Sequence, residues 1–116
     1  MKYACLIYGD GNLVDPVSES DLNRLLDDTL AYHEELRKSG QLILSQILSR
    51  DSTTTIKKSH GRISVTDGPF METKEQLGGF FLIEARDLNE ALRIAAEHPV
   101  ADGDTIEVRA TYDPGA

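Results

Sequence analysis

Residues 62–85 read RISVTDGPFMETKEQLGGFFLIEA and place a polar loop between two segments that have the patterns of β-strands. In the first segment Ile63 and Val65 alternate with polar residues, which is typical of a strand with one buried face. The second segment, residues 80–83, is continuously apolar and follows a Gly-Gly pair, which is typical of a strand buried on both faces. The pattern therefore predicts a central strand near residue 80, and it makes the loop before this strand the most economical place for any chemistry.

That loop begins with turn-forming residues, because Asp67 is followed by Gly and Pro. Asp can bond its own backbone two residues on, Gly tolerates positive φ, and Pro fixes φ. Apolar residues are expected to anchor the loop to the core, which would hold its charged residues in a fixed geometry. The expected anchors are Phe70, Met71 and Leu77. The charged residues, which could bind a small substrate, bridge two subunits or simply face solvent, are Glu72, Lys74 and Glu75.

The sequence DGPFMETKEQLGGFFLIEA at residues 67–85 closely resembles the signature of the DGPF subgroup of the YCII-related family of small bacterial proteins. The resemblance continues through DLNEALRIAAEHP at residues 87–99 to IEVR at residues 106–109, so it covers nearly the whole chain. It implies a dimeric α+β barrel. Some DGPF relatives look to be fused to, or found beside, sigma-factor-like regulators, which implies a transcription-regulator protein as a possible partner.

Composition restricts the class of protein. The chain has 116 residues, enough for one domain, residues 1–116, with one core. Its formal net charge of −8 disfavours nucleic-acid and membrane partners, although residues 50–62 are locally basic. The apolar run at residues 2–8 is too short for a signal peptide or a membrane span, so a cytoplasmic location is expected. Cys5, the single cysteine, lies in this run and is expected to be a core residue.

The order of predicted elements is β-α-β-(ββ)-β-α-β. The first helix is expected to start at Ser18 or Ser20 and to end at Gly40, with an apolar stripe that includes His33. Asp87 and a Glu three residues later predict the start of a second helix, which ends before a proline. The expected strands are residues 2–8, 41–48, 53–58, 61–66, 80–83 and 105–111. The chain therefore reads as an α+β protein, ferredoxin-like βαββαβ with an inserted β-hairpin.

Two helices can cover only one face of such a sheet. The alternating residues Phe80 and Leu82 nevertheless require burial as much as Phe81 and Ile83 do. A second copy of the sheet is the simplest cover, and this argument predicts a symmetric homodimer whose sheets face each other.

The chain has no strong catalytic, cofactor-binding or metal-binding motif, so neither a cofactor nor a metal is expected. The best acid/base candidate is His33, because a buried imidazole near a carboxylate can transfer protons. Asp67 could supply that carboxylate. Both residues also have structural interpretations, His33 as a satisfied core histidine and Asp67 as the cap of its own turn. Arg109, in the last strand, could bind a substrate carboxylate or face solvent.

In the broader YCII-related family, a histidine and an aspartate look to lie in a cleft between sheet and helices. Counting back from the glycine that ends the first helix, the histidine of those relatives falls at Thr29, one turn before His33. Their acidic residue before a proline falls at His98, which is otherwise expected to complement the negative end of the second helix.

Two functions from different classes follow. The first is a small-molecule enzyme of the lyase or isomerase kind, which uses His33 and Asp67 for proton transfer and Lys74 or Arg109 to hold an anionic group. The second is a non-catalytic ligand-sensing or regulatory module that contacts a transcription regulator.

Overall fold

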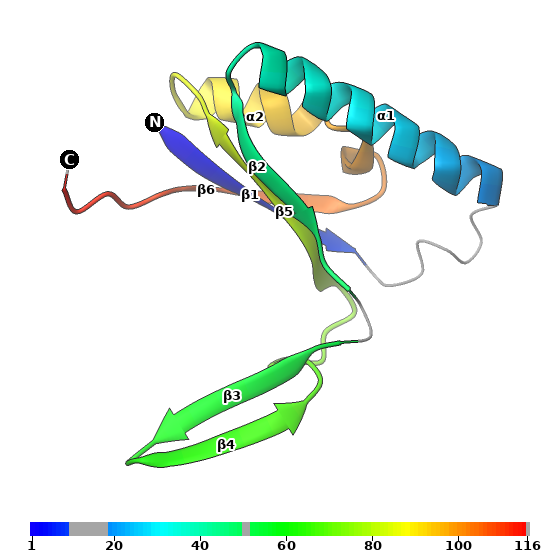
Figure 1. Ribbon diagram of the computed structural model, residues 1–116. Coiled ribbons are helices and arrows are strands. Elements are labelled where there is room, and N and C mark those ends of the chain that lie inside the picture. Colours follow the sequence, from blue (N-terminus) through cyan, green and yellow to red (C-terminus); the bar gives the residue numbers. More distant parts are fainter. Residues whose placement is uncertain (10–18, 50–51, 116) are drawn as a thin grey trace.

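The computed structural model describes residues 1–9, 19–49 and 52–115 of the chain. Four strands form an antiparallel sheet in the order β2-β5-β1-β6 (Figure 1). This is the ferredoxin-like arrangement with a hairpin inserted between β2 and β5, so the predicted fold class is confirmed. The elements of this body are β1 Lys2–Gly9, α1 Glu19–Lys38, β2 Leu42–Ile47, β5 Gln76–Glu84, α2 Leu88–Glu97, the short 3₁₀ helix η1 Pro99–Ala101 and β6 Thr105–Ala110.

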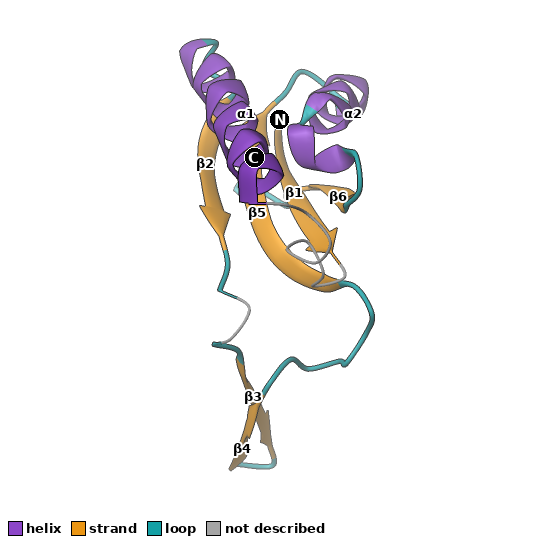
Figure 2. Ribbon diagram, turned by 90° about the vertical axis from the view of Figure 1, so that its right-hand side faces the viewer, coloured by secondary structure: helices purple, strands orange, loops and turns teal. Residues whose placement is uncertain are grey.

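The core lies between the sheet and its two helices, which share one face of the sheet (Figure 2). Strand residues that point to this face alternate along the chain, so Cys5, Phe81 and Ile83 are fully buried. From α2, Ile94 packs against them. The residues between them, such as Phe80, point to the face without a helix and are half-buried. The sequence predicted a strand that needs burial on both faces, and the fold of one chain buries the Phe81 and Ile83 face.

The inserted hairpin forms a separate two-stranded sheet, β3 Thr54–Ser59 paired with β4 Arg62–Asp67. The turn between them has His60 at φ 51° and Gly61 at φ 80°, the positive values that a two-residue hairpin turn of the favoured twist requires. Figure 1 shows this hairpin standing away from the four-stranded sheet. We call residues 54–67 the arm.

Both helices differ in detail from the sequence prediction. Ser20 lies inside α1 and does not cap it, and Ser18 lies outside the described residues. Asp87 caps α2 as predicted, because its carboxylate accepts a hydrogen bond from the backbone N–H of Glu90 at 2.9 Å. The buried residues of α2 are Ala91, Ile94 and Ala95. In the described part of the chain no helix is both long and apolar enough to cross a bilayer.

The loop after the arm is not anchored as expected. Phe70 is 80% exposed, Met71 59% and Leu77 41%, so within one chain these apolar residues do not hold the loop against the core. The expectation was wrong because apolar residues in a loop identify a need for burial and do not identify the surface that provides it.

Gly79 is needed where β5 passes β2. A methyl group added there would lie 3.0 Å from the carbonyl oxygen of Gln46, whereas one added at Gly78 would have its nearest neighbour at 4.0 Å. We therefore expect Gly79→Ala to lower the free energy of unfolding by about 1–3 kcal/mol, because the two strands must move apart. The matched variant Gly78→Ala should change it by less than about 1 kcal/mol, since it chiefly restricts the unfolded chain. Urea denaturation of both variants tests this, and equal losses would contradict it.

Candidate functional site

A cavity of about 660 Å³ lies between α1 and the sheet, a volume suited to a small organic ligand. The sheet forms one side of the cavity, and Gly78 and Gly79 of β5 leave space there because they have no side chains. The apolar stripe of α1 lines the cavity instead of filling a core, and only Leu36, near the end of the helix, is buried. The α1 residues at the cavity are Leu22, Leu25, Leu26, Thr29, Leu30 and His33.

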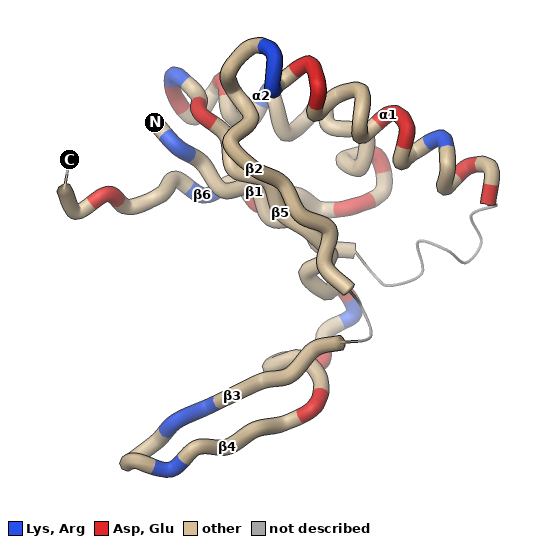
Figure 3. Tube along the Cα trace, in the orientation of Figure 1, with Lys and Arg blue, Asp and Glu red and all other residues tan. Residues whose placement is uncertain are grey.

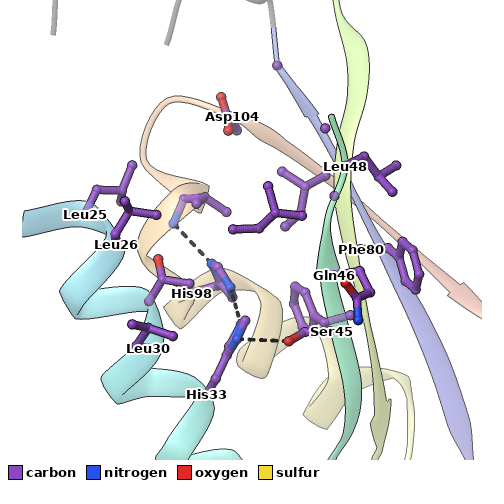
Figure 4. Close-up of a pocket in the computed structure, with 18 of the residues that line it drawn as sticks. Leu25, Leu26, Leu30, His33, Ser45, Gln46, Leu48, Phe80, His98 and Asp104 are labelled. Atoms are coloured by element: carbon purple, nitrogen blue, oxygen red, sulfur yellow. Dashed lines mark hydrogen bonds between the residues drawn. The ribbon is translucent and has the colours of Figure 1, made fainter. Parts of the chain in front are cut away.

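Two histidine side chains point toward each other at the wall of this cavity (Figure 4). The Nε2 atoms of His33, from α1, and His98, from the turn between α2 and η1, are 2.8 Å apart. Nδ1 of His33 is 3.3 Å from Oγ of Ser45 on β2. Elements that are distant in sequence thus combine into one chain of hydrogen bonds, which crosses from the sheet to both helices.

The backbone fixes the direction of these hydrogen bonds. The N–H of Val100 donates to Nδ1 of His98 at 3.2 Å, and an N–H can only donate. Nδ1 of His98 is therefore unprotonated, and the neutral ring carries its proton on Nε2. That proton is donated to Nε2 of His33, so the proton of neutral His33 is on Nδ1 and is donated to Ser45. Ser45 is consequently an acceptor from His33 and is not activated by it as a nucleophile.

Both imidazoles are held neutral. Burial, and then the charge that His33 would carry, lowers the pKa of His98 to about 4. Burial, and then the nearby Arg37 guanidinium, lowers the pKa of His33 below its ordinary value. The geometry gives the same sign, because a second proton between the rings would set one N–H against another. His98 was expected to complement the negative end of α2 as a cation. This expectation was wrong, because the ring is neutral.

Aromatic packing positions His98. Its ring is stacked on Phe81, with centroids 4.9 Å apart and an interplanar angle of 17°. The ring of Tyr32 is nearly perpendicular to that of His98, at an interplanar angle of 82° and a centroid distance of 5.6 Å, and the Tyr32 hydroxyl donates to the carbonyl of Ile94 at 2.6 Å. His98 is only 2% exposed, so these contacts leave it one preferred orientation.

Of the predicted site residues, only His33 lies at the cavity. Asp67 is the last residue of β4, opposite Thr54 on the arm, and the structure does not bring it to His33 within one chain. Arg109 lies on β6 beside Ala4 of β1, and its side chain is 69% exposed. Glu72 and Lys74 are exposed in the loop that precedes β5. Among the described residues the carboxylate at the cavity is Asp104.

Sequence reasoning missed His98 and Ser45 as site residues. A signal for His98 was available, since it occupies the position before a proline where relatives look to carry an acidic residue. Ser45 had no such signal, because a single serine in an apolar strand is common. Within the described ranges no group of three or more His, Cys, Asp or Glu residues is arranged to hold a metal ion.

This geometry defines a small α+β protein with a ligand-sized apolar cavity and a polar histidine pair in its wall. The model of the YCII-related domain matches residues 1–113, so the chain belongs to the YCII-related family. The resemblance read from the sequence is thereby confirmed at the level of the family, and the DGPF subgroup stays a prediction.

One relative in sequence and one solved structure of similar fold illustrate the range of this similarity. The uncharacterized protein R00369 of Rhizobium meliloti (strain 1021) is 37% identical over 120 residues, which cover 99% of this chain and 97% of that protein. The 5-chloro-2-hydroxyhydroquinone dehydrochlorinase TftG from Burkholderia phenoliruptrix AC1100, solved in complex with 2,5-dihydroxybenzoquinone, superposes with a TM-score of 0.55. That structure is 16% identical and the match covers 97% of this chain and 94% of TftG, so the likeness concerns the fold.

Proposed function

We propose that the protein is a small-molecule enzyme of the lyase or isomerase kind, in which His33 and His98 perform acid/base chemistry in the apolar cavity. The observation that carries this proposal is the contact of 2.8 Å between the two Nε2 atoms. Nε2 of His33 presents a lone pair, and Nε2 of His98 carries a hydrogen. The pair therefore offers one acceptor and one donor side by side, in surroundings where hydrogen bonds are strong because water is largely excluded.

The ligand that suits this pair carries a hydroxyl, or another acidic hydrogen, beside a carbonyl. Such a molecule would part the two rings, donate to Nε2 of His33 and accept from the N–H at Nε2 of His98. Each histidine exchanges one hydrogen bond for another, so no buried polar group is left unpaired. The remainder of the ligand would be apolar, to match the leucine and phenylalanine side chains around it.

Proton transfer follows from this arrangement. Nε2 of His33 takes the acidic proton of the substrate, and the N–H of His98 stabilises the charge that develops on the carbonyl oxygen. His33 then returns the proton to another atom of the same substrate, which is an isomerisation, or to a leaving group, which is an elimination. A lowered pKa suits this cycle, because the ring is unprotonated at neutral pH and releases the proton readily.

The fold of the dehydrochlorinase supports this class of reaction, since that enzyme binds a hydroxyquinone. The roles of four other residues at the site stay predictions. These residues are Asp67, Glu72, Lys74 and Arg109. Because none of them lines the cavity of its own chain, we expect any contribution from the arm and its loop to come from a second copy. A cytoplasmic location also stays a prediction.

We further propose that the chain is a homodimer. The sheet face without a helix is apolar at its centre, where Leu6 pairs with Phe80 and Ala4 pairs with Leu82, and all four residues are half-buried. A second sheet placed against this face would remove these side chains from water, at about 25 cal/mol for each Å² of apolar area.

A ligand-sensing module is the second candidate, and one observation favours it. Nε2 of His33 accepts a hydrogen bond from His98, so the site can exchange this bond for one to a ligand, and can thus bind and signal without turning its ligand over. A transcription regulator is the partner proposed for this alternative.

A thermal-shift screen shows whether the cavity binds a ligand, because any molecule that binds the native state raises the melting temperature of the protein. The first probe should be 2,5-dihydroxybenzoquinone, with unsubstituted benzoquinone as a control that lacks the hydroxyl donor. We expect stabilisation by the hydroxyquinone, at 100 times its Kd by about 2.7 kcal/mol, and loss of this stabilisation in His98→Asn. Equal shifts for both probes would contradict the proposed recognition, whereas product formation from any stabilising ligand would favour the enzyme over the sensor.

A further inference from the structure

The arm has one apolar and one polar face. Residues directly opposite each other in a hairpin lie on the same face, so Ile56 and Val65 share a face, which near the turn also carries Ile63 opposite Lys58. The opposite face pairs Lys57 with Ser64. Amphipathic strands of this kind normally place their apolar face on a core.

The described residues of the same chain offer the arm no core to pack on. Ile56 is 67% exposed, Val65 64% and Ile63 60%. Among the described residues, the backbone hydrogen bonds of the arm stay within it and its base, where the N–H of Gly68 donates to the carbonyl of Thr53 at 2.8 Å. An isolated two-stranded hairpin is at best marginally stable in water, so this arm requires a surface to pack on.

The overall dimensions agree with an arm that extends from the body. The radius of gyration of the Cα atoms is 16.3 Å, compared with about 13 Å for a compact chain of this length. The exposed side chains of Phe70 and Met71, at the base of the arm, enlarge the apolar surface that needs a cover.

Charge identifies the occupant of this surface. The arm holds Lys57, Lys58 and Arg62 against Asp67, a formal charge of +2, so with −8 for the whole chain the remainder carries −10 (Figure 3). A basic arm is therefore complementary to the acidic body of the same protein. That acidic body would repel a nucleic acid or an anionic membrane brought to the arm. In a two-fold dimer each copy supplies one arm and one body, so the complementarity is satisfied twice.

We infer that the apolar face of the arm packs on the body of a second copy of this chain. This inference rests on the homodimer proposed above and specifies a part of its interface. The arm of one copy reaches over the other, and Ile56, Ile63 and Val65 are buried between them. Asp67 and the loop that follows it are carried to the second copy with the arm.

The variant Ile56→Lys/Val65→Glu tests the inference. These two residues are direct cross-strand partners, so the new Lys and Glu form an opposite-charge pair that supports the hairpin and leaves the net charge unchanged. The control is Ser64→Glu, which creates the same Lys and Glu pair with Lys57 on the polar face. Sedimentation equilibrium measures the dimer dissociation constant of each protein.

We expect the wild-type chain, of 12.8 kDa, to sediment as a dimer at micromolar concentration. The double variant should weaken the dimer by at least about 100-fold, because two central apolar contacts are replaced by charges that lose water on burial. The control should differ from wild type by less than about threefold. In the wild type, the backbone amide hydrogens of residues 54–67 should exchange with solvent more slowly at protein concentrations above the dimer dissociation constant than at concentrations below it. The double variant should not show this difference.

Each remaining outcome overturns a stated part. A wild-type chain that stays monomeric at 100 times the concentration used would overturn both the dimer and the arm contact, and would leave the arm to a different protein. A double variant that dimerises as tightly as wild type, or amide exchange that is independent of concentration, would overturn the arm contact alone. None of these results bears on the chemistry of the histidine pair.

Discussion

Replacement of His33 by glutamine is expected to lower the turnover of an identified substrate by about 10²- to 10⁴-fold, the usual contribution of a general base. Glutamine keeps a polar group near the position of the imidazole, and its carbonyl oxygen can accept the N–H of His98. It cannot accept and hold a proton near neutral pH. The loss should therefore appear in kcat and kcat/KM together, because the interaction that disappears belongs to the transition state.

Ser45→Ala provides the comparison for this variant. It removes the acceptor for Nδ1–H of His33 but leaves the Nε2 lone pair, so a smaller loss is expected from less exact positioning of the ring. If His33→Gln turned its substrate over within threefold of wild type, the role of His33 as a base would be wrong. If His33→Gln bound the ligand as tightly as wild type, and neither the wild type nor this variant turned the ligand over, the sensing module would be the better description.

Acid should destabilise the protein between pH 6.5 and pH 4 through His98. With an ordinary pKa of 6.5 and a pKa lowered to about 4 in the fold, this residue contributes about 3 kcal/mol of stability at neutral pH. In that window the unfolded chain binds a proton that the folded chain does not, so the free energy of unfolding falls as the pH falls. The contribution is complete above pH 6.5 and is lost at about pH 4. The lowered pKa of His33 acts with the same sign.

The test measures urea denaturation at intervals from pH 7.5 to pH 4.5 in the wild type and in His98→Asn. Asparagine can still accept the N–H of Val100 but does not titrate, so its profile should be flatter even if the variant is less stable at every pH. The charged group that acts on His98 is the His33 imidazole on α1, and the one that acts on His33 is the Arg37 guanidinium. A wild-type profile no steeper than that of the variant would contradict the proposed origin of the acid sensitivity.

Much of the fold could be read from local patterns because these depend on near neighbours in the chain. The continuous apolar run at residues 80–83 identified a strand that needs burial on both faces, and the Asp87 cap identified the start of α2. The arm was predicted as a hairpin within one or two residues of its observed bounds. Its separation from the body was not predicted, since apolar alternation shows that a strand has a face to bury without indicating the surface that will bury it.

The candidate site depended on contacts that no local pattern contains. His33 was selected from its place on the apolar stripe of α1, and the structure does place it at the cavity. Its expected partner Asp67 lies on the arm, and its observed partner His98 is 65 residues away in sequence. A short turn of backbone, in which the N–H of Val100 sets the proton position on His98, decides which ring donates and which accepts.

The sequence by itself determined the order of the elements, the strands that need burial and the membership of the YCII-related family, because periodicity, capping residues and a contiguous motif are properties of neighbouring positions. Only the tertiary structure decided that the stripe of α1 lines a cavity, that two neutral histidines share a hydrogen bond there and that the arm stands free of its own body. These features depend on which surfaces meet when the chain folds, and contacts between distant segments are set by the packing of the whole.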